Sequence, residues 1–231
     1  MKFENYVREI QLIYKQHPND QREEELYSLL LSILRERKNC FDLSVRDVHL
    51  PLNHRNELLY GLTSYPDFII TKVNFKDNQD KFDHSNLLGC VEVKALGVDL
   101  PMDYQILGHL IWYKKVLYTN GLCWKFYEFN NKIDSAKLEH ISHECYEKLK
   151  EVYKNNNKGE DKKEIVKMQY EFLRDYLKVK NNKSEYVTEI TMTLCETEEL
   201  AYFRKNAQKQ LPDIKREKWD SLLTILDTIE W

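Results

Sequence analysis

The spacing of apolar positions changes several times along the chain, and each spacing predicts a different element. Apolar residues that recur every three or four positions predict helices in the N-terminal segment and in several later ones. Apolar residues that alternate with polar ones, or that run together over a few positions, predict strands between them. We expect helices over residues 3–16, from 19 or 20 to 37, over 103–113 and over 213–231, and strands over 67–73, 87–96, 116–119 and 124–129.

Other parts of the chain carry weaker patterns. Residues 43–50 suggest a strand or an irregular edge, and the β-branched stretch 187–194 is compatible with either kind of element. The order strand, strand, helix, strand, strand predicts an α/β fold with a mixed sheet and helices packed on it. A change of character near residue 134 predicts a core over 1–134 and a mainly helical C-terminal extension over 135–231, which can share that core.

Composition narrows the classes of protein to consider. The chain has 231 residues, of which 42% are hydrophobic and 32% charged, enough for a large core with a solvated surface. Its 35 basic and 38 acidic residues give a net charge of −3. Proteins that coat nucleic acid show a basic excess, so any contact with nucleic acid must be a local patch.

Cysteines and apolar runs bear on the compartment. The five cysteines are dispersed, without a C-x-x-C pair, so we expect reduced thiols in a cytoplasmic protein. The longest apolar run, at 29–34, is far too short to span a bilayer, and the N-terminal residues do not resemble a signal peptide. We therefore expect no membrane partner.

Charged residues stand at corresponding ends of the two first predicted strands. Asp67 begins one strand, and Glu92 and Lys94 lie on the same face of the next, which should form a hairpin with it. A carboxylate and an ammonium on a core strand are costly to desolvate unless they pair or hold a metal. Oxygen ligands of this kind suit a hard divalent cation. An ordinary ion pair on a solvated strand face is the alternative.

A further carboxylate has an unusual position on the second predicted helix. Glu23 falls within the apolar stripe of that helix, whereas Glu24 and Glu25 fall away from its centre. Glu23 is either a first-turn charge that favours the helix dipole or an additional carboxylate that reaches the site.

Together these residues resemble a known nuclease motif. Pro66–Asp67 followed by Glu92–Val93–Lys94 is similar to the PD-(D/E)XK motif, and over about residues 20–130 the chain resembles the nuclease domain at the N-terminus of type I restriction enzyme R subunits. The further residues that carry the similarity are 92–97, Gln105, 119–121 and Trp124. One departure is His109, which lies four residues after Gln105 at a position where relatives often have a tyrosine.

The resemblance implies a restriction-endonuclease-like fold and a division of roles. Asp67, Glu92 and the main-chain carbonyl of Val93 would bind Mg²⁺ or Mn²⁺, and Lys94 would orient and activate the attacking water. It implies a metal-dependent endonuclease that hydrolyses the phosphodiester bonds of DNA, in restriction or phage defence. The implied catalytic set is Asp67, Glu92, Lys94, Glu23 and Gln105.

Other functions are also compatible with the sequence. One is a catalytically inactive protein of the same fold that docks a protein partner through its C-terminal helices, in phage defence or counter-defence. Another is an RNA endonuclease, and a homodimer is compatible with each. Trp219 and its apolar stripe can pack against the body or against a second copy, and His140, His143 and Cys145 suggest a zinc site that lacks a fourth ligand nearby.

Overall fold

A computed structural model describes residues 1–16, 23–37, 42–48, 59, 62–75, 86–134, 136, 171, 173–205 and 210–231. Six strands form one sheet in the order β1-β2-β3-β4-β5-β8. The strands are β1 (Leu43–Asp47), β2 (Phe68–Lys72), β3 (Leu87–Val93), β4 (Lys115–Thr119), β5 (Cys123–Phe129) and β8 (Val187–Thr193), with β6 (Val179–Lys180) and β7 (Lys183–Ser184) as a separate hairpin. The helices are α1 (Phe3–Gln16), η1 (Glu23–Leu26), α2 (Tyr27–Arg35), α3 (Tyr104–Tyr113), α6 (Thr197–Lys205) and α7 (Arg216–Thr228).

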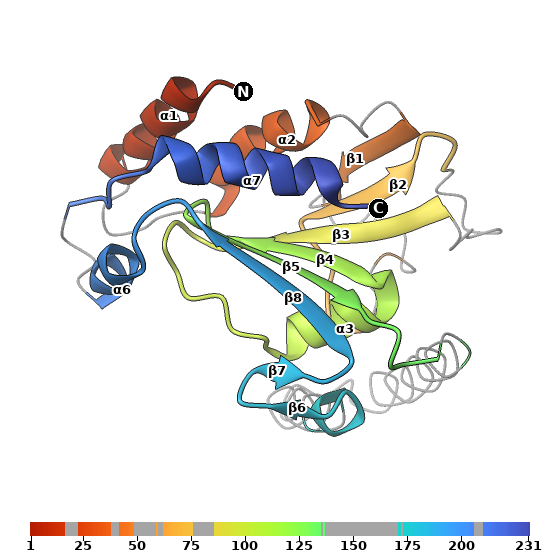
Figure 1. Cartoon of the computed structure of the whole chain (residues 1–231). Helices are drawn as coiled ribbons and strands as arrows, with labels where there is room; N and C mark the ends of the chain where they lie inside the picture. The colour runs from red at the N-terminus through yellow and green to blue at the C-terminus, as the bar shows by residue number, and fades with distance from the viewer. Residues whose placement is uncertain are drawn as a thin grey trace, which may run out of the picture.

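The sheet is mixed, and helices cover both of its faces. β3 and β4 are parallel and are connected through α3, whereas every other neighbouring pair in the sheet is antiparallel. Figure 1 shows α1, α2 and α7 on one side of the sheet and α3 on the other. The predicted α/β class, with a mixed sheet flanked by helices and a helical C-terminal part, is confirmed. Within the described residues no helix is both long and apolar enough to cross a membrane.

The strand β8 gives the ambiguous stretch near the C-terminus a definite structure. It pairs along its whole length with β5, from Val187 opposite Phe129 to Thr193 opposite Cys123. The described chain beyond residue 134 therefore adds a strand to the central sheet, in addition to the helices α6 and α7. The cause is tertiary, because β-branched residues favour a strand once a partner edge is offered to them.

Several predicted boundaries differ from the structure. The expected second helix starts instead as the 3₁₀ turn η1 and becomes α-helical only at Tyr27, where Leu26 at the N-cap has no side chain able to cap it. Residues 19 and 20, where we expected that helix to begin, lie outside the described residues. β3 ends at Val93 and not at 96, because the chain turns at Gly97, whose φ is +73°.

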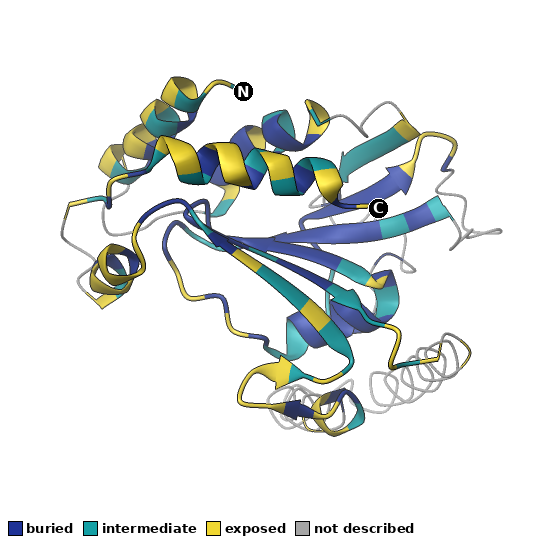
Figure 2. Cartoon of the chain, viewed as in Figure 1, coloured by how far each residue is buried: buried dark blue, intermediate teal, exposed yellow. Residues whose placement is uncertain are grey.

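The C-terminal helix packs against the body of the protein. The ring of Trp219 in α7 lies 4.4 Å from the ring of Tyr6 in α1, measured between centroids, and Trp219 is buried. The hydroxyl of Tyr6 donates to the carbonyl of Gly121, in the turn between β4 and β5. The apolar stripe of α7 is thus used inside the molecule, which Figure 2 shows as buried positions on the side of α7 that faces the sheet.

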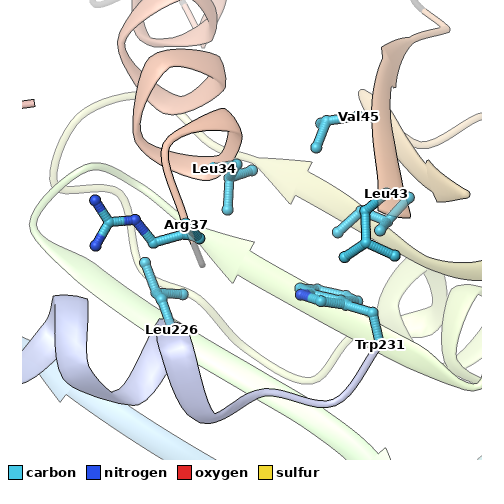
Figure 3. Close-up of a pocket in the computed structure, with 7 residues that line it drawn as sticks. Leu34, Arg37, Leu43, Val45, Leu226 and Trp231 are labelled. Carbon is cyan, nitrogen blue, oxygen red and sulfur yellow. The ribbon is translucent and has the colours of Figure 1, made fainter. Parts of the chain in front are cut away.

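Trp231, which follows α7, packs against the strands β3 and β5. The indole ring of Trp231 lies against Gly89 of β3 and makes an edge contact with Phe126, at 5.6 Å between ring centroids. A Cβ at Gly89 would meet that ring at 2.8 Å, so the close approach requires glycine. Figure 3 shows a small pocket beside Trp231, lined by Leu34, Arg37, Leu43, Val45, Ile70 and Leu226.

The cysteines that the structure describes agree with the expectation of reduced thiols. Cys90, Cys123 and Cys195 are free and buried, and burial raises the pKa of each thiol. The residues that suggested a zinc site, His140, His143 and Cys145, lie outside the described residues.

Candidate metal and catalytic site at the ends of strands β2 and β3

The antiparallel pairing of β2 with β3 brings the first two candidate residues together. Phe68 pairs with Val91, so Asp67 lies beside the end of β3. Its Oδ2 accepts a hydrogen bond of 2.7 Å from the amide N–H of Val93, the residue that follows Glu92. Both carboxylates are almost fully buried. The hairpin predicted from the sequence therefore places Asp67 at the carboxyl end of β3.

The helix α3 brings in the predicted glutamine. Asp103 caps α3 by accepting hydrogen bonds from the amides of Gln105 and Ile106, which fixes the start of the helix next to the end of β3. Lys94 then bridges strand and helix: its Nζ donates to Glu92 Oε1 at 2.7 Å and to Gln105 Oε1 at 3.2 Å. Lysine, glutamate and glutamine thus form one hydrogen-bonded chain.

His109, one turn further along α3, completes the hydrogen bonding of Glu92. Its Nε2 lies 3.2 Å from Glu92 Oε2 and 3.5 Å from the hydroxyl oxygen of Ser64. Because a carboxylate only accepts hydrogen bonds, we assign the proton to Nε2. Ser64 in turn accepts a bond of 3.0 Å from Gln105 Nε2. The His109 ring is fully buried, and Nδ1 has no hydrogen-bond partner among the described residues.

The helix α2 covers the other side of Asp67. The hydroxyl of Tyr27 donates to Asp67 Oδ1, so both oxygens of this carboxylate are held by the protein. Glu23 lies one turn earlier and is partly buried, and Glu24 is exposed as expected, but Glu25 is also partly buried. The charge of Glu23 raises the pKa of both Asp67 and Lys94, which puts it within electrostatic reach of the site.

The buried charges shift one another's protonation. Burial, together with the neighbouring charge of Glu92, raises the pKa of Asp67 from its usual 3.8 to about 7. Burial opposes ionisation of Glu92 as well, but the hydrogen bonds and charges of His109 and Lys94 lower its pKa overall. Burial would lower the pKa of Lys94, yet the adjacent Glu92 raises it. At neutral pH the site therefore holds an ammonium, a carboxylate and a second carboxyl group near its titration midpoint.

The donor set fits a hard divalent cation that keeps part of its water. Mg²⁺ binds proteins through one or two carboxylates and retains several water molecules. Asp67 and Glu92 are two such carboxylates on adjacent strands. In the part of the chain that the structure describes, no group of three or more His, Cys, Asp or Glu side chains is arranged to hold a metal ion. A cation here would rest on these two carboxylates, main-chain oxygen and water.

Sequence reasoning found most of this cluster but not all of it. Asp67, Glu92, Lys94 and Gln105 lie together, and Glu23 lies near them. Three participants had no predicted role, namely Tyr27, Ser64 and His109, of which the last was noted only as a departure from the motif. Tyr27 stands four residues after Glu23 and hence on the same helical face, a signal that was available in the sequence. Ser64 lies in an irregular segment, and nothing in its sequence context indicates its contact with Gln105.

Comparisons with known proteins do not add to this description. No protein-family model matches the chain, and neither the curated proteins nor the solved structures contain a match to it. Its function has to be inferred from the chemistry of the site itself.

Proposed function

We propose that the protein is a Mg²⁺- or Mn²⁺-dependent nuclease of the PD-(D/E)XK type that hydrolyses phosphodiester bonds of DNA. One observation carries this proposal. The residues that the motif selects from three separate stretches of sequence, Asp67, Glu92–Val93–Lys94 and Gln105, belong to one hydrogen-bonded cluster. The mixed sheet flanked by helices is compatible with the restriction-endonuclease-like fold that the resemblance implies. The free thiols of Cys90, Cys123 and Cys195 are compatible with a cytoplasmic role in restriction or phage defence.

Two carboxylates would hold the metal in this mechanism. Asp67 and Glu92, with the main-chain carbonyl of Val93, would bind it where the strands β2 and β3 meet. A bound divalent cation neutralises charge on the phosphate and lowers the pKa of its water to make a nucleophile. Tyr27 and the Val93 amide keep the Asp67 carboxylate oriented, and His109 does the same for Glu92.

Lys94 acts as a donor in this scheme. Its Nζ lies 2.7 Å from Glu92 Oε1, so it would reach the attacking water or a phosphate oxygen beside the metal and orient it by a hydrogen bond. The Oε1 of Gln105 fixes the direction of Nζ. Lys94 would thus orient and activate the attacking water, as the resemblance implies.

Cleavage assays with matched variants test the proposal. Plasmid DNA, single-stranded DNA and RNA would each be incubated with Mg²⁺ or Mn²⁺ and the wild type, Asp67→Ala, Lys94→Met or Lys125→Met. Lys125 is a matched control, since it is 22% exposed against 20% for Lys94 and also pairs with a glutamate, Glu189. We expect the first two variants to lose about 10²-fold or more in rate and the control to keep its rate.

Two results of the cleavage assays would change the proposal. Equal cleavage by the wild type, Asp67→Ala and Lys94→Met would reject the assigned roles. Cleavage of RNA alone would change the substrate class and leave the site assignment standing.

One observation favours a second candidate, an inactive nuclease-like protein that binds a partner. All four carboxylate oxygens of the site already accept hydrogen bonds from the chain, from Tyr27 and Val93 on Asp67 and from Lys94 and His109 on Glu92. Calorimetry with Mn²⁺ separates the candidates. A heat of binding that disappears in Asp67→Ala supports the nuclease, and the absence of any heat in the wild type supports the inactive protein.

A further inference from the structure

A small basic hairpin lies outside the site described above. The strands β6 and β7 are joined by Asn181 and Asn182, both left-handed with φ of 50° and 59°. Two such residues are typical of a type I′ turn, a tight connection that fixes strand register. In Figure 1 the hairpin leads directly into β8.

The register of the hairpin sets two lysines against each other. Lys180 pairs with Lys183, so two ammonium-bearing side chains stand directly opposite one another. Like charges in this arrangement destabilise a strand pair. Neither lysine forms an ion pair with any residue that the structure describes. Among the described residues nothing offsets this pair of charges, as expected of a surface that binds an anion.

Neighbouring residues extend the positive charge into a cleft. Lys178 is held by Glu185 at 2.5 Å and by the ring of Tyr186, and Arg174 donates through Nε to the carbonyl of Val179 at 3.2 Å. The residues that line the cleft are Arg174, Asp175, Lys178, Val179, Lys180, Lys183, Ser184 and Glu185, with four basic and two acidic side chains among them. This is a local basic patch on a chain whose net charge is −3.

We propose that this hairpin cleft binds the phosphate backbone of the nucleic acid on which the protein acts, at a distance from the bond that is cleaved. The inference rests on the proposed nuclease function. Lysine and arginine contacts to phosphate supply affinity without reading sequence, and an ammonium pair with no ion-pair partner among the described residues is suited to that task.

The sheet sets the spacing between the hairpin and the nuclease site. The hairpin joins β8 at Val187, and the other end of β8, Thr193, pairs with Cys123 near the turn that follows β4. Seven residues of an extended strand cover roughly 20 Å, and the three strand spacings between β8 and β3 add roughly 14 Å across the sheet. Together they separate the hairpin from the site by roughly 25 Å, which at about 3.4 Å per nucleotide equals about seven nucleotides. The hairpin would therefore contact a phosphate about seven nucleotides from the scissile bond.

Binding measurements on the full chain test the proposal. Fluorescence anisotropy in EDTA would follow a labelled long DNA duplex of about 24 base pairs, with the wild type and the double variant Lys180→Gln/Lys183→Gln. The control Lys15→Gln/Lys72→Gln removes the same charge from exposed positions on α1 and at the end of β2. We expect the hairpin variant to bind the long duplex about ten-fold more weakly at low salt, with a salt slope reduced by about 1.8, which is 0.9 for each of two lost contacts.

The thermal stability serves as an internal check. We expect the hairpin variant to keep or slightly raise its Tm because the opposed charges are gone. Unchanged affinity and salt slope on the long duplex would overturn the proposal, and so would equal weakening by the control variant Lys15→Gln/Lys72→Gln. Tighter binding of poly-glutamate than of DNA by the wild type would overturn it in favour of an acidic protein partner.

Cleavage assays keep this result separate from that of the proposed function. Cleavage of the long duplex by the wild type with Mg²⁺, together with an unaffected hairpin variant, would reject the surface alone. Binding through the hairpin without cleavage would reject the nuclease assignment alone.

Discussion

Replacing Asp67 by asparagine should stabilise the metal-free protein above pH 7. The carboxyl of Asp67 has a pKa raised from 3.8 to about 7, first by burial and then by the charge of Glu92. The difference, at 1.36 kcal/mol per pH unit, means that keeping this group ionised costs up to about 4 kcal/mol of folding free energy. An uncharged isostere removes that cost.

The hydrogen bonds of the site tolerate the amide. Oδ2 of Asp67 accepts from the Val93 amide and Oδ1 accepts from the Tyr27 hydroxyl. An asparagine oxygen can replace Oδ2, and its NH₂ group can donate to the Tyr27 hydroxyl, which is able to accept as well as donate. Some loss of fit offsets part of the gain, so we expect about 1–3 kcal/mol of net stabilisation at pH 8, or a Tm higher by about 3–10 °C.

The sign of the pH dependence provides the sharper test. Between about pH 4 and 7 the folded protein keeps a proton on Asp67 that the unfolded chain has lost, so the free energy of unfolding of the wild type falls as pH rises through this window. Asp67→Asn lacks that fall, and its advantage should disappear at about pH 5. Thermal unfolding in EDTA at both pH values would measure this, with Asp213→Asn, at an exposed ion pair with Lys215, as the control. A lower Tm at both values, or an equal rise at both, would refute the reasoning.

Two further substitutions test the orientation of Glu92 and the packing of Trp231. His109→Leu should weaken Mn²⁺ binding in calorimetry about 10- to 100-fold because Glu92 loses the donor that orients it. His109→Gln should restore most of the affinity because its amide can reach the same oxygen, and equal loss in both variants would show that His109 acts by filling space alone. Trp231→Ala should lower the free energy of unfolding by about 2 kcal/mol in urea titration, roughly half the loss for a fully buried tryptophan, since its ring is partly buried against Gly89 and Phe126. An unchanged unfolding midpoint would show that this ring adds no stability.

Local pattern predicted the strands of the site and the residues at their ends. The alternation around Glu92 and Lys94 and the proline before Asp67 are signals within a few residues, and the hairpin of β2 and β3 follows from them. The contact between Tyr27 and Asp67 joins residues 40 positions apart, and no periodicity records such a pairing. A resemblance to a motif can select residues from separate elements, but it does not give the protein groups that hydrogen-bond to them.

The strand β8 shows the same limit at the level of the fold. Its β-branched residues do not by themselves choose between helix and strand, and the deciding partner is the free edge of β5, about 60 residues earlier in the chain. The left-handed turn at Gly97, which ends β3 earlier than its apolar pattern suggests, is decided by backbone conformation and not by hydrophobicity.

The contact of Tyr6 with Trp219 has a consequence for synthesis. The first helix finds its partner only after another 213 residues have been made, since Trp219 lies that far from Tyr6. At about 5–20 residues per second, the ribosome needs on the order of ten to forty seconds to deliver it. Throughout that interval Tyr6 lacks the ring that covers it in the folded protein, so its apolar side chain is open to contacts with other molecules.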